Sequence, residues 1–342
     1  MKRPTMVDIA RRAGVTKSAV SFALNGRPGV SEATRARVLA IADELGWQPN
    51  SAARALSDGR AGAFGLVVAR PARSLGIEPF FMQLVSGIQG ELSGDGTSLL
   101  FTVASDAAAE TATHRAWWAQ RKVDGVFLVD MRLDDPRVAA LEELRLPAVV
   151  IGAPVDCGGL PAVWSDEAAA VRTAVAHLAG LGHRSIAHVT GPAALRHTLI
   201  RAEAFTAATA ERGLTGRNVE ADYSGEQGFA ATRALLEGGE RPTAIVYDND
   251  VMAVSGLSAA QSLGVRVPDD LSLVAWDDSP LCELVRPALT TLRRDVAAYG
   301  ALAARQLRDA AAGRSVEHRR APDPALTVRD STAAPSRDTA AL

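Results

Sequence analysis

From Ala63 to Asp277, short apolar runs alternate with amphipathic stretches of helical length, and this alternation constrains the fold more than any other feature. The runs AFGLVVA, from Ala63, and SLVAWD, from Ser272, are typical of buried strands. Strands that alternate with helices build parallel sheets covered by helices on both faces. The pattern therefore predicts an α/β body.

The predicted elements fall into two successive sets, which indicates two doubly wound parallel-sheet lobes. The predicted strands are 63–69, 97–104, 124–130, 147–152, 185–191, a short one near 220–223, 243–248, 272–277 and the late segment LTVRDST from Leu326. The predicted helices are 79–96, 108–122, 136–144, 166–181, 198–212, 225–238 and 249–263.

The segment from Thr5 to Asn25, TMVDIARRAGVTKSAVSFALN, predicts two short helices joined by a tight turn. Thr5 with Asp8 three residues later is typical of a capping box, and Gly14 can end the first helix. Thr16 can cap the second helix. This is the pattern of a helix-turn-helix, so an all-α head is predicted to precede the body.

The second predicted helix presents a polar outer face with a basic residue near its start. Lys17, Ser18, Ser21 and Phe22 lie on that face, which suits the major groove of DNA. A helical hairpin that merely caps a larger domain is the open alternative. A third helix, which Ser31 can cap, favours the DNA-binding interpretation because three helices can enclose a small core.

Charge separates the head from the rest of the chain. The first 60 residues carry ten basic and five acidic residues, a net charge of +5, whereas the whole chain is −2, which leaves −7 for the remainder. A basic head on an acidic body is the electrostatic pattern of a phosphate-binding module joined to a body that need not bind nucleic acid.

The chain resembles the LacI/GalR (lac repressor) family of bacterial transcriptional regulators in motifs spread from end to end. In the head, the matching segments are VDIARRAGVTKSAVSFALNG, RPGVSEATRARVLAIADELGWQPN and ARAL. In the body they are LGHRSIAHVTGP, RAEAF, DNDVMA, VPDDLSLVAWDD, PALTTLRRD and LTVRDST. Their order and spacing make a chance match very improbable.

The resemblance implies a periplasmic-binding-protein-like body, in which the chain crosses between the lobes near residues 162, 292 and 322. The expected organisation is a helix-turn-helix domain at 1–49, a hinge helix and linker at 50–61, an effector-binding and dimerisation domain at 62–332, and a disordered tail at 333–342. Within the body, lobe 1 is expected at about 62–162 and 293–322, and lobe 2 at about 163–292 and 323–332.

In the family, paired hinge helices lie in the minor groove, where a leucine wedges between base pairs and bends the duplex. Leu56 is the matching position, and a plain linker with one stray leucine is the alternative. Phe22 stands where many members carry arginine, so an apolar contact, such as one to a thymine methyl, is expected there. The candidate DNA-binding residues are Thr5, Thr16, Lys17, Ser18, Ser21, Phe22, Asn25, Ser31, Asn50, Ala53 and Leu56.

Polar side chains at strand ends predict a ligand site in the cleft between the lobes, because such sheets bind ligands beyond the carboxyl ends of their strands. Carboxylates and guanidinium groups suit hydroxyls, and aromatic faces suit a sugar ring. The candidate effector-binding residues are Phe80, Trp164, Asp166, Arg201, Tyr223, Asn249 and Asp277, with Phe81 as a further weak candidate. Helix capping or an interlobe hydrogen bond remains open for Asp250 and Asp278, and core packing for Phe80 and Phe81.

The expected function is a ligand-responsive repressor that binds a palindromic operator on double-stranded DNA as a homodimer and is released by a sugar or sugar derivative. A corepressor-dependent regulator responding to a nucleobase or nucleoside is the alternative. Less favoured is an enzyme without a regulatory role, since no phosphate loop, GxSxG elbow or zinc spacing occurs. A sugar-binding protein for transport is also less favoured, because it would need export and would have no use for the basic head. No cofactor and no metal site are predicted.

The composition predicts a cytoplasmic protein without a membrane partner. No hydrophobic run approaches membrane-spanning length, and the start MKRPTMVDIARR lacks the apolar core of a signal peptide. Cys157 and Cys282 lack metal-ligand spacing and are interpreted as ordinary thiols. The segment after Gly313 has no leucine heptads, so a dimer rather than a helical tetramer is expected, with a frayed end from about Ala333.

Overall fold

The computed structural model describes residues 4–47, 60–71 and 75–336. The chain divides into two compact units, Met1–Ala61 and Gly62–Leu342, each of which is described by itself. Across the described ranges, every helix is too short or too polar to cross a membrane.

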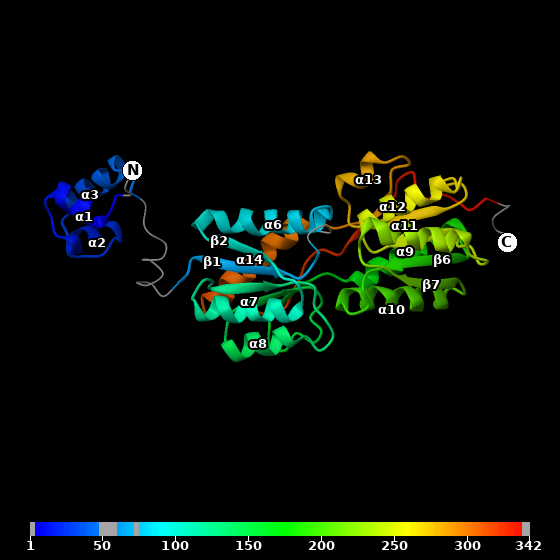
Figure 1. The fold of residues 1–342 in the computed structure, drawn as a ribbon, viewed down its shortest axis with the longest axis horizontal. Helices are drawn as coiled ribbons and strands as arrows, with labels where there is room; N and C mark the ends of the chain where they lie inside the picture. Colours follow the sequence, from blue (N-terminus) through cyan, green and yellow to red (C-terminus); the bar gives the residue numbers. More distant parts are fainter. Residues whose placement is uncertain (1–3, 48–59, 72–74, 337–342) are drawn as a thin grey trace. The chain divides into compact units, whose positions relative to one another are not determined.

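The head unit is a three-helix bundle of α1 (Met6–Ala13), α2 (Lys17–Leu24) and α3 (Glu32–Glu44) (Figure 1). Thr5 and Asp8 form the predicted capping box, and Thr16 caps α2. The buried residues of its core are Ile9, Ala10, Ala13, Val20, Ala23, Val38 and Ala42. These observations confirm the helix-turn-helix head.

The body contains two six-stranded sheets. The first has the order β11-β5-β4-β3-β1-β2 and is parallel; its strands are β1 (Ala63–Val68), β2 (Ser98–Val103), β3 (Gly125–Leu128), β4 (Ala148–Ile151), β5 (Ala162–Trp164) and β11 (Arg319–Arg320). The second has the order β12-β10-β9-β8-β6-β7, with β12 antiparallel; its strands are β6 (Ser185–Thr190), β7 (Thr215–Glu220), β8 (Ala244–Tyr247), β9 (Ser272–Trp276), β10 (Thr290–Arg293) and β12 (Ala325–Thr327).

Helices cover both faces of each sheet, which confirms the predicted doubly wound α/β body (Figure 1). In lobe 1, α6 (Pro79–Leu92) and α14 (Val296–Ala311) cover one face, and α7 (Ala107–Ala119) and α8 (Pro136–Leu144) cover the other. In lobe 2, α9 (Glu167–Leu181) and α10 (Arg196–Glu211) lie opposite α11 (Gly225–Glu237) and α12 (Asp250–Ser262). The short helices are η1 (Ser93–Asp95) and α13 (Pro280–Leu284).

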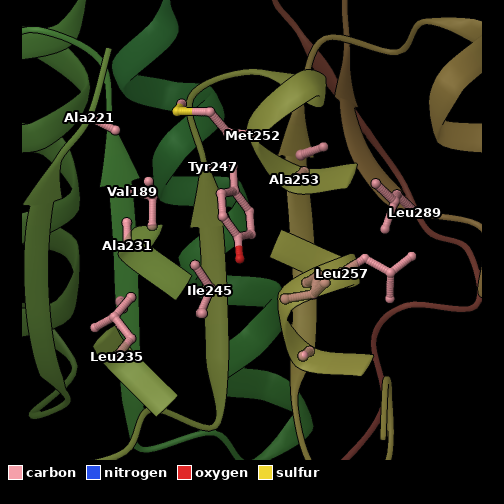
Figure 2. Close-up of a cluster of buried hydrophobic side chains, with 14 of the residues drawn as sticks. Val189, Ala221, Ala231, Leu235, Ile245, Tyr247, Met252, Ala253, Leu257 and Leu289 are labelled. Carbon is pink, nitrogen blue, oxygen red and sulfur yellow. The ribbon is translucent and has the colours of Figure 1, made fainter. Parts of the chain in front are cut away.

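The core of lobe 2 illustrates how the buried strands hold these helices. Figure 2 shows Ile245 and Tyr247 on β8 among side chains of the two helices that cover this face, including Leu235 and Leu257. The Tyr247 hydroxyl lies 2.8 Å from the Thr232 hydroxyl, so the one polar atom of this large buried ring is satisfied.

The chain passes between the lobes three times, in the segments between β5 and α9, between β10 and α14, and between β11 and β12. Residues before the first passage belong to lobe 1, and those between the first two belong to lobe 2. The end of β10 leads directly to Arg294, which lines the pocket described below.

Three local expectations need correction. The short strand predicted near 220–223 is β7, at Thr215–Glu220, which is largely exposed at a sheet edge and therefore lacks an apolar run. Arg201 lies in the second turn of α10 and does not open that helix. The frayed end does not begin at Ala333: its N–H donates to Ser272 Oγ at 3.1 Å, and its carbonyl lies 2.9 Å from Nε2 of His183.

Candidate functional site

The outer face of α2 carries most of the predicted DNA-binding residues of the head. Lys17 and Ser18 are exposed in the first turn, and Ser21 is half-buried one turn later. Asn25 ends α2, and its amide Nδ2 donates to Ser21 Oγ at 3.4 Å. The face therefore exposes a cation and a hydroxyl near the start of the helix, groups that can contact phosphates or base edges.

Three of the predicted residues are helix caps. The side chains of Thr5, Thr16 and Ser31 accept backbone N–H groups at the starts of α1, α2 and α3. The hydroxyls are therefore occupied within the head, and these residues place helix N-termini, which favour phosphate oxygens.

Phe22 is only partly available to a partner. Its side chain is 38% exposed, and the ring lies so close to Gly29 that a Cβ there would be 3.1 Å from Cδ2 of the ring. The backbone of Gly29 has φ +116°, which glycine adopts without strain. Phe22 thus both packs on the turn after α2 and exposes an edge. Asn50, Ala53 and Leu56 lie outside the described residues.

The body contains a pocket between its lobes, with about 560 Å³ of space that includes the open mouth. Both lobes line it with charged and aromatic side chains. The lining residues are Arg70, Glu78, Phe80, Phe81, Val129, Asp130, Ile151, Gly152, Glu167, His197, Arg201, Tyr223, Asp248, Asp277, Arg294 and Tyr299. Of the predicted effector-binding residues, the pocket brings together Phe80, Arg201, Tyr223 and Asp277.

Arg201 is fixed at the pocket by three partners. Its Nε donates to Glu167 Oε2 at 3.0 Å and its Nη1 to the carbonyl of Asp248 at 3.1 Å. The guanidinium also stacks on Trp276, 3.7 Å from the ring centroid. A planar, permanently charged donor held in this way can offer hydrogen bonds to a ligand in a set direction.

Asp248 is itself held by the buried His188. Nε2 of His188 lies 2.9 Å from Asp248 Oδ1, and the N–H of Gly191 donates to Asp248 Oδ2 at 3.0 Å. Burial acts to raise the pKa of Asp248. The interactions with His188 and Arg201 outweigh this effect and lower the pKa to about 2. The carboxylate is therefore ionised and anchors Arg201 at neutral pH.

Asp277 follows β9 directly and pairs with Arg294, whose Nη2 donates to Asp277 Oδ1 at 3.2 Å. Arg294 also donates to Glu167 Oε1 at 3.2 Å. It lies in the second passage between the lobes, next to the end of β10. Glu167 thus bridges Arg201 and Arg294 and ties the pocket to the connection between the lobes.

Tyr223 presents its ring to the pocket and its hydroxyl to lobe 2. The hydroxyl lies 2.7 Å from Nε2 of His197 and 2.8 Å from the Thr198 hydroxyl. Arg70 of lobe 1 lies over the ring, 4.5 Å from its centroid. Gly191 makes room for Tyr223, because a Cβ at that position would lie 2.0 Å from the Tyr223 ring carbon Cζ.

The backbone is left-handed at three pocket residues: Asp130 has φ +51°, Tyr223 +68° and Asp277 +62°. Each follows a strand of the body. Such conformations cost a non-glycine residue free energy and gather at functional sites, where the surrounding structure enforces them. Here they turn side chains at the strand ends toward the pocket.

Aromatic rings supply the apolar part of the lining. Phe80 is half-buried and Phe81 is buried, and their rings meet edge to face with centroids 5.3 Å apart. Phe81 also packs in the core of lobe 1, so for this residue the core and pocket interpretations both hold. Tyr299 of α14 adds a third ring.

Three predicted effector-binding residues do not line the pocket. Asn249 caps α12: its Oδ1 accepts from the N–H of Met252, and its Nδ2 donates to the carbonyl of Tyr223 at 3.0 Å, so it positions Tyr223. Asp166 caps α9 by accepting from the N–H of Ala169. Trp164 lies under the guanidinium of Arg320 at 5.1 Å. A strand-end position brought each near the cleft, but local capping or stacking uses its side chain.

Most of the lining from lobe 1 and from the connections between the lobes was not predicted from the sequence. Arg70 and Asp130 form a bidentate pair, with distances of 2.7 and 3.1 Å. Asp130 ends the predicted strand DGVFLVD, so the strand-end rule that found Asp277 could have found it. The other missed polar and aromatic lining residues are Glu78, Glu167, His197, Asp248, Arg294 and Tyr299.

Near neutral pH, His197 is uncharged and Glu78 is only partly ionised. Burial, with the nearby Arg201, lowers the pKa of His197 to about 4, so its ring is neutral. Burial, opposed by Arg70 and assisted by neighbouring carboxylates, raises the pKa of Glu78 to about 7. In the described part of the chain, no three histidine, cysteine or acidic side chains are grouped as a metal site. The pocket is thus equipped for hydrogen bonding and stacking.

Comparisons with known proteins match both units. Residues 5–50 match the family described as "Bacterial regulatory proteins, lacI family", and residues 175–332 match "Periplasmic binding protein-like domain". The HTH-type transcriptional regulator CelR of Thermobifida fusca is 32% identical over 324 residues, covering 92% of this chain and 94% of CelR. A regulator from the aml 5′ region of Streptomyces limosus is 38% identical over 343 residues, covering 96% and 95%.

Solved structures extend the likeness to the fold. The lac repressor dimer bound to operator and the anti-inducer ONPF superposes with a TM-score of 0.87 at 27% identity, covering 97% of this chain and 100% of that one. A CelR–cellobiose complex gives a TM-score of 0.73 at 30% identity, covering 96% and 100%. The chain therefore belongs to the LacI family of ligand-responsive, DNA-binding transcriptional regulators.

Proposed function

We propose that this protein represses transcription as a homodimer on a palindromic operator and that a sugar bound between the lobes releases it from DNA. The observation that carries the proposal is the pocket, in which Arg201 and Asp277 face the same space as the rings of Phe80 and Tyr299. Paired hydroxyls of a sugar suit the two charged groups, and the apolar faces of a sugar ring suit the aromatic rings.

The comparisons support a carbohydrate more than a nucleobase. A solved structure of the relative CelR holds cellobiose. The pocket's charged groups are carboxylates and guanidinium groups, and this mixture of acceptors and donors matches a ligand with many hydroxyls, each both donor and acceptor.

Exposed apolar side chains on lobe 1 support pairing with a second copy. Strand β2 is the edge strand of its sheet, and Phe101 and Val103 on it are exposed. Met82 of α6 is 55% exposed, and α6 packs beside β2. An edge strand with exposed apolar residues is normally covered in a stable protein. The match to the lac repressor dimer agrees with this use.

Two-state linkage explains how the pocket can control the head. A sugar that binds one arrangement of the lobes more tightly shifts the population toward it, and DNA affinity changes by that difference in free energy. Arg70 over Tyr223 is a contact that crosses the pocket here, and a different arrangement of the lobes would break it. The ligand need not touch DNA to alter its binding.

Thermal-shift screening of the purified protein against a panel of sugars tests the proposal, followed by fluorescence anisotropy with DNA from its own promoter region. We expect a sugar to raise the melting temperature and to weaken DNA binding. A ligand that strengthens DNA binding would show corepression instead. If nucleosides shift the protein and sugars do not, the effector class is wrong.

Arg201→Ala and Asp277→Ala provide the site-specific control. Each should abolish the sugar response while DNA binding persists, because both residues lie in the body and not in the head. Normal responses in both variants would place the effector elsewhere.

A further inference from the structure

Glu78 occupies a helix-capping position without capping the helix. It is the N-cap of α6, directly before Pro79, yet its side chain makes no capping hydrogen bond. The residue is only 7% exposed, and it lines the pocket between the lobes. A carboxylate at this position ordinarily accepts a backbone N–H from the helix that it precedes. The backbone of α6 therefore does not orient the Glu78 carboxyl group.

The Oε2 atom of Glu78 is buried and has no hydrogen-bond partner among the described residues. An unsatisfied buried oxygen of this kind costs about 1–3 kcal/mol, more if it is charged. In native structures such an atom normally finds its donor in an ordered water, an ion or a bound ligand. Glu78 lines the space that an effector would fill, so a ligand can supply this donor.

The surrounding charges offer no protein donor to take that role. Arg70 is the cation that acts on Glu78, but it is committed to a bidentate pair with Asp130. The other groups that act on Glu78 are the carboxylates of Asp130, Asp277 and Asp250, which make its ionised form less favourable. A ligand hydroxyl that donates to Glu78 would relieve both the missing hydrogen bond and part of this repulsion.

The lining as a whole carries more negative than positive charge. Five carboxylates (Glu78, Asp130, Glu167, Asp248 and Asp277) face three guanidinium groups (Arg70, Arg201 and Arg294). Each of these arginines is already paired with a carboxylate, at 2.7, 3.0 and 3.2 Å. Among the described lining residues, therefore, no unpaired cation stands ready for an anionic ligand, and the neutral His197 adds none.

We propose that Glu78 is a specificity-determining residue, which accepts a hydrogen bond from a hydroxyl of an uncharged sugar and makes the pocket reject phosphorylated sugars. This inference rests on the proposed sugar response and narrows its ligand class. A phosphate would bring roughly two negative charges into a lining that has a surplus of carboxylates and no free arginine, and like charges at close range are strongly unfavourable in a partly desolvated site.

Titration calorimetry on the full chain tests the inference with matched probes. The uncharged probes are cellobiose, maltose, trehalose and glucose, and the charged counterparts are trehalose 6-phosphate and glucose 6-phosphate. We expect at least one uncharged sugar to bind and each phosphate to bind at least tenfold more weakly than its uncharged counterpart. For the best sugar, Glu78→Ala should weaken binding about tenfold, and Glu78→Gln, which keeps an acceptor, should weaken it less.

Glu226→Gln is the matched control, since Glu226 is an exposed acidic residue in the first turn of α11 and does not line the pocket. It should bind sugar as the unmodified protein does. If Glu78→Ala fails to fold, Glu78→Gln and the comparison of sugars with phosphates on the unmodified chain still decide the question.

The outcomes separate this inference from the proposed function. Tight binding of a sugar phosphate, or unchanged sugar affinity in Glu78→Ala and Glu78→Gln, overturns the role of Glu78 and leaves a sugar-responsive regulator in place. Failure of every sugar and sugar phosphate to bind the folded protein overturns the sugar response, and this inference with it.

Discussion

The guanidinium carbon of Arg201 lies over the fully buried ring of Trp276, 3.7 Å from its centroid. Trp276 does not line the pocket. Trp276 packs against Arg201 from outside the pocket lining. This contact helps to set the direction of the guanidinium, and so Trp276 shapes the site without lining it.

Trp276→Phe should therefore weaken sugar binding about three- to tenfold, because the smaller ring supports Arg201 less well. DNA affinity without sugar should not change. Calorimetry and anisotropy measure the two quantities. Trp118→Phe, at a 48% exposed position on α7, is the control and should alter neither. Unchanged sugar affinity in Trp276→Phe would mean that Arg201 is held well enough by Glu167 and Asp248.

Gly191→Ala should disrupt the pocket through Tyr223. The added Cβ would lie 2.0 Å from Cζ of Tyr223, so the ring must move away from its contacts with His197 and Thr198. We expect a loss of the sugar response and a destabilisation of about 1–3 kcal/mol. Gly180→Ala in α9 has open space at the new Cβ and should be neutral or slightly stabilising. A normal sugar response in Gly191→Ala would show that the ring can shift without consequence.

The periodic part of the sequence sufficed to predict the architecture, because buried strands such as 244–247 are continuous apolar runs between helices. Strand β7 was misplaced since its six residues are mostly exposed and carry no such pattern. Helix α14 and strand β5 were not predicted, and both lie beside passages between the lobes, where the chain order alone does not reveal which sheet an element joins.

The site was predicted only in part, for a related reason. Strand ends pointed to Tyr223 and Asp277, but the same rule also selected Asn249 and Asp166, whose side chains cap helices. Which of two polar residues at a strand end faces a cleft depends on local backbone angles. Glu78 was missed because its lack of a capping bond is visible only in three dimensions.

Glu78→Gln should change how stability depends on pH. Burial raises the pKa of Glu78 from its ordinary 4.5 to about 7, so the folded state favours its neutral form, and this stabilisation is lost as the pH rises from about 4.5 to about 7. The glutamine variant stays neutral. Its stability should match that of the unmodified protein near pH 4 and exceed it by on the order of 2–3 kcal/mol near pH 8. Denaturant unfolding across this range provides the measurement.

Asp250 also titrates in this window, since burial raises its pKa to about 6, but it is present in both proteins and cancels in the difference. The remaining charged neighbours of Glu78 are Arg70, Asp130 and Asp277. A stability difference that does not vary with pH would contradict the assignment of the titration to Glu78.

Arg196 joins the lobes at one edge of the pocket. Its N–H donates to the carbonyl of Met131 at 2.7 Å, and its guanidinium pairs with Asp156 of lobe 1. Arg196→Ala should weaken sugar affinity several-fold, with less than about 1 kcal/mol lost from the free energy of unfolding, because the pair is partly exposed. Calorimetry at low and high salt checks this: the affinity of the unmodified protein should fall with salt more than that of the variant.

Exchanging the two charges, with Arg196→Asp and Asp156→Arg together, should restore part of the lost affinity. If the double variant binds no better than the single one, the ion pair does not hold the lobes together.

Lys17 and Phe22 should affect DNA binding in different ways, although they lie on the same helix of the head. Lys17 is an exposed cation near the start of α2, so Lys17→Ala should weaken binding to all sequences and reduce the salt dependence by about one released counterion. Phe22→Ala removes an apolar edge without charge and should change operator preference while leaving the salt dependence intact.

Because Phe22 also packs on Gly29, the melting of the head must be followed in parallel with DNA binding. Binding isotherms for specific and unrelated DNA at several salt concentrations distinguish the two roles. If Phe22→Ala leaves a stable head with unchanged preference, the apolar edge is not a base contact, and its packing on the turn is its whole contribution. If Lys17→Ala alters preference but not salt dependence, the lysine contacts a base edge and not a phosphate.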